Sequence, residues 1–422
     1  MTHAPISAAS GNAENGNTAN GNTANRGATL RGANASRNLR LPLATGGLES
    51  YTVSPPRDFT RSVTVPFNRI AYSAVHVVAD PRKTQDPWLD CAIDWDATMA
   101  FRRHIWGLGL GVAEAMDTAQ RGMGVDWPSS LELIRRSMDA QKDFPGALLA
   151  SGAGTDHLAP EAARSIDDVV RAYEEQIEAI EALGGRIILM ASRALARVAR
   201  SPDDYHRVYD RILSQVAQPV IIHWLGEMFD PALAGYWGNA DHLLAMDAAV
   251  AALNRNAAKV DGVKVSLLDK DKEIRMRRQL VPQVKMYTGD DFNYPELIAG
   301  DDQGFSHALL GIFDAIAPAA SAALGALAAS DMATYQSILE PTVPLSRHIF
   351  KAPTRFYKTG VVFMAYLNGH QNHFTMIGGQ QSTRSIQHLS ELFRLADRAG
   401  LLANPELACA RMQHTLALHG VE

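Results

Sequence analysis

Eight short apolar runs, each followed by a longer amphipathic stretch, constrain the fold of this chain more than any other feature. The runs are Arg69–Val77, Leu110–Ala115, Ala147–Ser151, Arg186–Met190, Pro219–His223, Gly262–Leu267, Val284–Thr288 and Ala308–Phe313. The stretches that follow them have helical patterning. After the third run, SIDDVVRAYEEQIEAIEALGG offers Ser165 as an N-cap and a Gly-Gly pair as the end of a helix.

This alternation predicts a parallel sheet with helices on its outside. Strands that are buried on both faces read as continuous apolar runs, and strict strand–helix alternation places them parallel to one another. Eight such units over about 250 residues are typical of a (β/α)8 TIM barrel. An open doubly wound sheet usually carries a Gly-rich phosphate loop after its first strand. Here the first run leads into Val-Val-Ala-Asp-Pro, so we expect the barrel.

Composition changes along the chain and divides it into three parts. Residues 1–58 consist largely of Asn, Gly, Ala, Thr and Ser, which bury too little surface to offset the entropy of ordering, so we expect a disordered low-complexity tail there. Residues 59–330 hold the eight units of the barrel. Residues 331–422 have helical patterning, and we expect additional C-terminal helices that pack on the barrel.

Charge and cysteine content restrict the partners. The net charge of -5 and the pI of about 6.3 argue against nucleic acid and anionic membranes, which select basic patches. The sequence has neither a long uncharged apolar run nor a secretory signal pattern. The two cysteines, Cys91 and Cys409, suit a reducing cytoplasm. We expect a cytoplasmic protein with a small-molecule substrate, whose C-terminal helices are a candidate homo-oligomer interface.

Lys264 stands in the apolar sixth strand, Val-Lys-Val-Ser-Leu-Leu. Side chains alternate between the two faces of a strand, so Lys264 shares a face with Ser266. A buried lysine needs a partner or a task. Desolvation lowers its pKa and frees the amine as a nucleophile for Schiff-base chemistry. The alternative is a structural ion pair, for instance with Asp290.

A second set of side chains is predicted at the carboxyl ends of the strands, where barrel enzymes carry their reactive groups. The set consists of His76, Glu114, His157, His223 and Glu227, which end or follow four different strands. Imidazole and carboxylate groups that converge there can hold a divalent metal. They can equally relay protons, bind sugar hydroxyls or be ordinary core and rim residues. No local metal motif supports this set.

Two further segments carry polar groups. The loop after the seventh strand contains Tyr287, Asp290 and Asp291; its carboxylates can bind hydroxyls or orient the lysine, or Asp291 can cap a helix. The later segments SRHIFKAPTRFYKTG and NGHQNH are rich in basic residues, which fit either an anionic substrate beside the barrel mouth or a solvated helix face. These residues are Arg347, His348, Lys351, Arg355, Lys358, His370 and His373.

Four segments resemble the dihydrodipicolinate synthase and N-acetylneuraminate lyase superfamily. KVDGVKVSLLD resembles its Gly-Ile-Lys-x-x-Ser/Thr segment, QPVIIHWLGEMF its fifth strand, VKMYTGDDFNYPELIAGDDQG its seventh strand, and DMATYQSILEPTVPLSRHIF its first C-terminal helix. The match covers roughly residues 66–360. The sequence as a whole is similar to a bacterial branch of dihydrodipicolinate synthase family proteins. The resemblance implies a class I lyase or aldolase in which Lys264 forms the Schiff base.

The sequence departs from that family at two places. The family binds the pyruvate carboxylate with Gly-Thr-Thr after its second strand, whereas here the loop reads Ala-Glu-Ala-Met-Asp-Thr, with only Thr118 and with carboxylates that repel an anion. The family's proton-relay tyrosine follows the fourth strand, and here Met-Ala-Ser-Arg-Ala-Leu contains none. The resemblance therefore leaves proton transfer to His223, His157 or Tyr287, and the donor need not be pyruvate.

These observations predict a Schiff-base carbon–carbon lyase, aldolase or dehydratase that acts on a small polyhydroxylated carbonyl compound such as a sugar or sugar-acid derivative, with no cofactor. The expected substrate-binding residues are Glu114, Asp117, Thr118, Ser266, Asp290 and Asp291. The alternative is a metal-dependent barrel isomerase, epimerase or aldolase that uses His76, Glu114, His157 and His223. A third hypothesis is a catalytically inactive barrel that serves as a binding or regulatory protein. The many polar residues at the ends of the strands argue against it.

Overall fold

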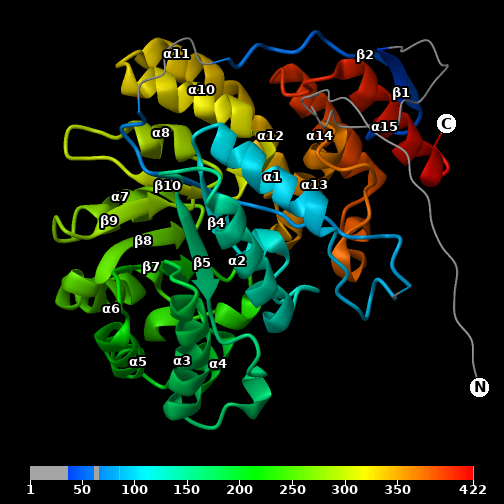
Figure 1. Ribbon diagram of the computed structural model, residues 1–422. Helices are drawn as coiled ribbons and strands as arrows, with labels where there is room; N and C mark the ends of the chain where they lie inside the picture. The colour runs from blue at the N-terminus through cyan, green and yellow to red at the C-terminus, as the bar shows by residue number, and fades with distance from the viewer. Residues whose placement is uncertain (1–36, 61–65, 85, 422) are drawn as a thin grey trace, which may run out of the picture. The chain divides into compact units, whose positions relative to one another are not determined.

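The computed structural model describes residues 37–60, 66–84 and 86–421. Eight parallel strands close into a barrel in the order β10-β3-β4-β5-β6-β7-β8-β9, as Figure 1 shows in part. The strands are β3 (Ala71–Ala74), β4 (Gly111–Glu114), β5 (Leu149–Ala153), β6 (Ile187–Leu189), β7 (Val220–Leu225), β8 (Val260–Ser266), β9 (Lys285–Thr288) and β10 (His307–Leu310). Each overlaps one of the predicted runs, so the (β/α)8 barrel is confirmed.

Helices connect the strands and surround the barrel. They are α1 (Trp95–Gly107), α2 (Trp127–Gln141), α3 (Ile166–Ala182), α4 (Arg193–Val198), α5 (Pro202–Gln215), α6 (His242–Arg255), α7 (Lys270–Arg277), α8 (Tyr294–Ala299), α9 (Ile312–Ala315) and α10 (Ala317–Ala328). The predicted start of α3 is confirmed: Ser165 accepts the Asp168 backbone N–H, and the Asp168 carboxylate accepts the Ser165 N–H in return. Gly184, at φ +80°, follows its last turn.

Alternation along the strands sorts side chains into an inner and an outer set. A separate apolar cluster fills the inside of the barrel: Tyr72, Ala74, Ala113, Met116, Ala150, Ile188, Met190, Ile221, Tyr287 and Leu309. Their strand neighbours, such as Val112 and Val263, belong instead to the large core between barrel and helices. Because the inside is filled from the amino-terminal end, the space left for a ligand lies at the carboxyl ends of the strands.

Part of the predicted tail is ordered, and that prediction is wrong for Asn38–Thr52. These residues form an antiparallel hairpin of β1 (Asn38–Pro42) and β2 (Leu48–Thr52). The Tyr51 hydroxyl donates to Asp397 over 2.7 Å, and Arg394 pairs with Glu49 over 2.7 Å. Contacts with a helix far along the chain hold the hairpin, and composition alone cannot reveal them. Residues 1–36 lie outside the described residues.

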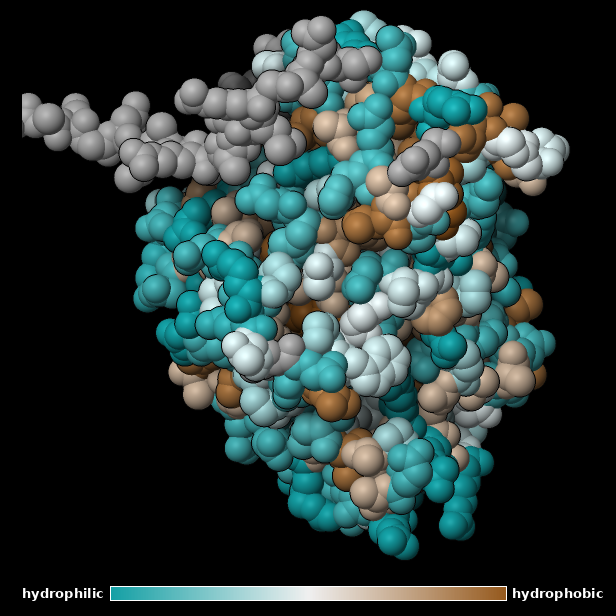
Figure 2. All heavy atoms as spheres, turned by 90° about the vertical axis from the view of Figure 1, so that its right-hand side faces the viewer, coloured by the Kyte–Doolittle hydropathy of each residue, from teal (hydrophilic) through white to brown (hydrophobic). Residues whose placement is uncertain are grey.

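The C-terminal part is helical, as expected. It contains α11 (Met332–Leu339), α12 (Val343–Ile349), α13 (Tyr357–Leu367), α14 (Ile386–Arg398) and α15 (Pro405–Leu418). The hairpin, α14 and α15 lie together in Figure 1, and their side of the molecule is hydrophilic over most of the surface visible in Figure 2. None of the helices in the described ranges has the length and apolar character that a membrane crossing requires. Cytoplasmic location and homo-oligomer formation stay predictions.

A buried glutamate outside the barrel gives a pH-dependent stability. Glu273 on α7 is 1% exposed and accepts a 2.7 Å hydrogen bond from Ser306. Burial raises the pKa of Glu273 from 4.5 to about 8. The folded protein therefore holds a proton there that the unfolded chain releases, and stability is lost as pH rises from about 4.5 through about 8.

We expect Glu273→Gln to remove this loss. At pH 5 its free energy of unfolding should lie within about 1 kcal/mol of the wild-type value, and at pH 9 it should exceed it by roughly 4–5 kcal/mol. Denaturant unfolding at the two pH values measures the difference. Glu178→Gln, at an exposed position on α3, is the control and should leave the pH dependence intact. An unchanged pH dependence in Glu273→Gln would contradict the assignment.

Candidate active site

Lys264 lies on the inner face of β8, near the carboxyl end of the barrel. Its neighbours across the sheet are His223 on β7 and Tyr287 on β9. The side chain is 7% exposed. Among the described residues, none forms a hydrogen bond or an ion pair with its Nζ. The structural ion pair with Asp290 considered above is therefore wrong, and an amine without a partner is left at the barrel mouth.

Burial sets the proton affinity of this amine. Desolvation lowers the pKa of Lys264, and the charges of Asp291 and Asp117 oppose that shift. The Asp291 carboxylate, after β9, accepts the Ile312 backbone N–H over 2.9 Å. Burial raises the pKa of Asp291 to about 7. Burial therefore favours the neutral form of both the amine and the carboxyl group.

His223 and Ser266 stand beside Lys264. The His223 Nε2 lies 3.2 Å from the Ser266 Oγ, while its buried Nδ1 has no partner. Burial and the charge of Lys264 lower the pKa of His223 well below its usual value. The ring is thus a neutral imidazole, held in orientation by a hydroxyl. Both residues are brought to the amine as the sequence predicted.

Asp117 and Thr118 follow β4 and face the same region. A cavity of about 80 Å³ is lined by Asp117, His223 and Thr155. Asp117 acts electrostatically on Lys264, and in the described part of the chain no side chain bonds to its carboxylate. A carboxylate that is free and borders a cavity can accept a proton or a hydroxyl group from a ligand.

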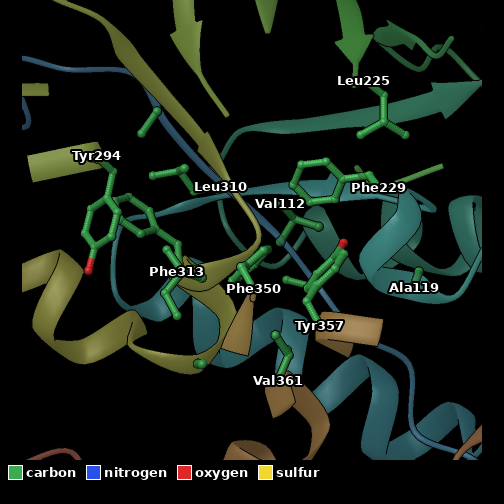
Figure 3. Close-up of a cluster of buried hydrophobic side chains, with 14 of the residues drawn as sticks. Val112, Ala119, Leu225, Phe229, Tyr294, Leu310, Phe313, Phe350, Tyr357 and Val361 are labelled. Carbon is green, nitrogen blue, oxygen red and sulfur yellow. The ribbon is translucent and has the colours of Figure 1, made fainter. Parts of the chain in front are cut away.

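Tyr357, which sequence reasoning missed, reaches the site from the first turn of α13. Its hydroxyl lies 2.8 Å from the Thr118 Oγ1. Phe350 stacks on its ring at 4.4 Å and Phe229 meets it edge-on at 5.9 Å, and Figure 3 shows the three rings together. Burial and the charges of Asp117 and Asp291 raise the pKa of Tyr357 well above 10. It is a fixed, protonated hydroxyl beside the free carboxylate.

Glu114 does not face the site, so the predictions that it binds substrate or metal are wrong. It forms two 2.9 Å hydrogen bonds with Arg102 of α1, and both side chains are 0% exposed. Ser137 of α2 also donates to it. The signal was in the sequence: Ala113 points into the barrel, so the next residue points toward the helices.

The remaining members of the metal set also face elsewhere. His76 binds Asp314 over 2.8 Å in the core between barrel and helices. His157 lies against α3, 2.8 Å from Gln176 and 3.3 Å from Glu175. The predicted convergence of His76, Glu114, His157 and His223 is therefore wrong, and so is the assignment of His157 as the proton carrier. Within the described ranges, no cluster of three or more His, Cys, Asp or Glu side chains could hold a metal ion.

Two predicted site residues of the seventh strand and its loop, Tyr287 and Asp290, form hydrogen bonds that stabilise the fold instead of facing the site. The Tyr287 hydroxyl donates to Asp261 over 2.6 Å, at the start of the neighbouring strand and away from the mouth. Asp290 accepts hydrogen bonds from Phe292 and Asn293 and so caps the turn before α8. An acid–base role for Tyr287 and substrate binding by Asp290 are therefore wrong. The helix-capping role considered for Asp291 is confirmed at α9, because its carboxylate accepts the backbone N–H of Ile312, the first residue of that helix.

Residues 39–421 match the model of a family described as protein of unknown function (DUF993). The chain belongs to the DUF993 family. No curated protein matches its sequence.

Solved structures show what fold this DUF993 chain shares. The E. coli K12 prophage protein YagE, of the dihydrodipicolinic acid synthase family, has a TM-score of 0.61 at 12% identity and covers 79% of this chain and 99% of its own. Dihydrodipicolinate synthase from Aquifex aeolicus has a TM-score of 0.59 at 10% identity, with coverages of 80% and 99%. Dihydrodipicolinate synthase from Acinetobacter baumannii has a TM-score of 0.59 at 15% identity, and the match covers 79% of this chain and 99% of that enzyme. The resemblance to this superfamily is confirmed in the fold.

Proposed function

We propose that this protein is a Schiff-base-forming carbon–carbon lyase, of the aldolase or dehydratase type, for a small polyhydroxylated carbonyl compound such as a sugar or sugar-acid derivative. The unpartnered, buried amine of Lys264 at the carboxyl end of a TIM barrel supports the proposal most directly. A lysine held there without an ion pair costs folding free energy, whereas a neutral amine in a desolvated site is the nucleophile that imine formation needs.

The surrounding groups suit the steps of such a reaction. The neutral amine adds to the carbonyl carbon, and the carbinolamine loses water to give an iminium ion. Cleavage of the neighbouring carbon–carbon bond leaves an enamine on Lys264 and needs a base for the hydroxyl proton. Asp117 is placed to accept that proton, with Thr118 and Tyr357 beside it. Protonation of the enamine and addition of water then restore the amine.

Borohydride trapping tests the proposal. Two neighbours with this fold are described in complex with pyruvate, so pyruvate is the first probe, followed by short hydroxyaldehydes and hydroxyketones. Reduction should attach the probe to the peptide that contains Lys264, and a Lys264→Met chain should stay unlabelled. Label on another lysine, or turnover of a probe without any label, would refute the Schiff base.

A substitution at Gly289 gives a second test of the Schiff-base proposal, because the absence of a side chain there leaves room for the side chain of Lys264. A Cβ at this position would come within 2.8 Å of the Lys264 Cε and would also clash with Ser266. We expect Gly289→Ala to displace the amine and to lower the trapping rate about 100-fold. Gly107→Ala, where a Cβ would meet nothing within 4 Å, should trap at the wild-type rate. Equal rates in all three proteins would show that the fit around Gly289 does not position the amine.

A further inference from the structure

A second buried lysine lies in the first turn of α13. Lys358 is 4% exposed, and its Nζ donates one hydrogen bond, over 3.2 Å, to the Arg355 carbonyl. Across the ranges that the structure describes, no carboxylate comes within ion-pair distance of it. Burial lowers the pKa of Lys358 to about 8, so it is mostly charged at neutral pH. Its Nζ also lies 4.5 Å from the centre of the Tyr357 ring. An ammonium group has three N–H donors, so this one can donate further hydrogen bonds to a ligand.

The charged groups next to Lys358 are those of the active site. The charges of Asp117 and Asp230 stabilise its positive charge, and that of Arg193 opposes it. All three side chains line the cavity beside His223. Tyr357, its chain neighbour, bonds to Thr118. Lys358 and Lys264 therefore share Asp117 as a charged neighbour, one lysine from α13 and the other from β8.

The other cations near Lys358 have ionic partners of their own. Arg193 pairs with Asp230, and Arg121 pairs with Asp156 over 2.7 Å. Asp117 acts on Lys358 through its charge, but in the described part of the chain no ion pair joins the two side chains. Lys358 is thus a buried cation without an ion pair, and a bound anion would supply one.

We propose that Lys358 binds an anionic group, a carboxylate or a phosphate, of the compound whose carbonyl reacts with Lys264. This inference rests on the proposed function and narrows its substrate class from polyhydroxylated carbonyl compounds in general to oxo acids or phosphorylated carbonyl compounds. It also gives α13 a role in substrate recognition, with Tyr357 at the reacting carbon and Lys358 at the charged end.

Anion binding can be measured without the imine chemistry. In a Lys264→Met chain no Schiff base forms, and calorimetric titration with inorganic phosphate and with succinate reports the Lys358 subsite alone. We expect Lys358→Met in that background to raise Kd at least 10-fold, and Lys358→Arg to restore much of the binding. Lys351→Met, at an exposed lysine in the preceding loop, should leave Kd unchanged. Equal Kd values for Lys358→Met and Lys351→Met would overturn the proposal.

Trapping with matched probes tests the same subsite in the working protein. Glyceraldehyde 3-phosphate is compared with glyceraldehyde, and succinate semialdehyde with butanal. We expect the charged member of one pair to label Lys264 at least 10-fold faster in the wild type, and the advantage to vanish in Lys358→Met. The pair that responds distinguishes phosphate from carboxylate. A rate ratio unaltered in Lys358→Met would overturn the inference while leaving the Schiff base standing.

The two failures are distinguishable. If no carbonyl probe labels Lys264 but phosphate or succinate binding still depends on Lys358, the anion site holds and the lyase proposal fails. If labelling is efficient and indifferent to Lys358, the reverse is true. Melting temperatures exclude misfolding as the cause: since Lys358→Met removes a desolvated charge, it should not melt below the wild type, and a variant that did would be replaced by Lys358→Gln.

Discussion

Lys264→Met is expected to abolish turnover, lowering kcat by about 10⁴-fold or more for the carbonyl compound that labels the wild-type protein. The amine of Lys264 is the nucleophile of the proposed reaction, and methionine fills a similar volume without a nucleophile. The melting temperature should stay the same or rise, because an unpaired buried amine is replaced by an apolar group.

Steady-state kinetics and thermal unfolding of the same preparations measure the two effects. Lys285→Met is the matched control, since Lys285 lies on the next strand but pairs with Asp261 over 2.8 Å at the far end of the barrel. It should keep kcat within a few-fold. A Lys264→Met protein with a kcat within 10-fold of the wild type would remove Lys264 from the mechanism.

Glu114→Ala is expected to lower the free energy of unfolding by about 3–5 kcal/mol. The substitution leaves the Arg102 guanidinium charged, 0% exposed and without its two carboxylate hydrogen bonds. Denaturant unfolding measures the loss. The double variant Glu114→Leu with Arg102→Met should recover much of it, because no buried charge remains.

An exposed ion pair provides the control for this prediction. Glu132 on α2 pairs with Arg135 over 2.7 Å and with Arg136 over 2.6 Å, at the protein surface, and Glu132→Ala should cost no more than about 1 kcal/mol. If Glu114→Ala cost as little, then Arg102 would have another way to satisfy its charge. Such a result would reopen a functional role for Glu114.

The sequence was sufficient to predict the barrel and to predict that Lys264 lies on the inner face of its strand. Both follow from local rules: continuous apolar runs mark strands buried on two faces, and alternation puts Lys264 and Ser266 on one face. The same alternation, applied to Ala113 and Glu114, would have predicted that Glu114 points away from the site. That error came from collecting polar residues near strand ends without asking which way each one points.

Other parts of the site could not be predicted locally. Tyr287 has the correct face, but its hydroxyl reaches down to Asp261, because side-chain direction along the barrel axis depends on the packing beneath it. Tyr357 comes from a helix that follows the barrel in sequence, and only the tertiary structure brings it to the site. Lys358 was among the basic residues considered for an anionic substrate, but only the structure shows that it is buried while Lys351 and Arg355 are exposed. A hint existed in the composition of α13: a lysine inside Tyr-Lys-Thr-Gly-Val-Val-Phe-Met is as anomalous as Lys264 in its strand.

The place of α13 in the chain also has a consequence for how the protein is made. A ribosome releases the chain from its amino-terminal end, so every barrel strand, Lys264 included, is synthesised before Tyr357 and Lys358 leave the exit tunnel. The proposed site would therefore be complete only after α13 has been synthesised, later than all eight strands of the barrel.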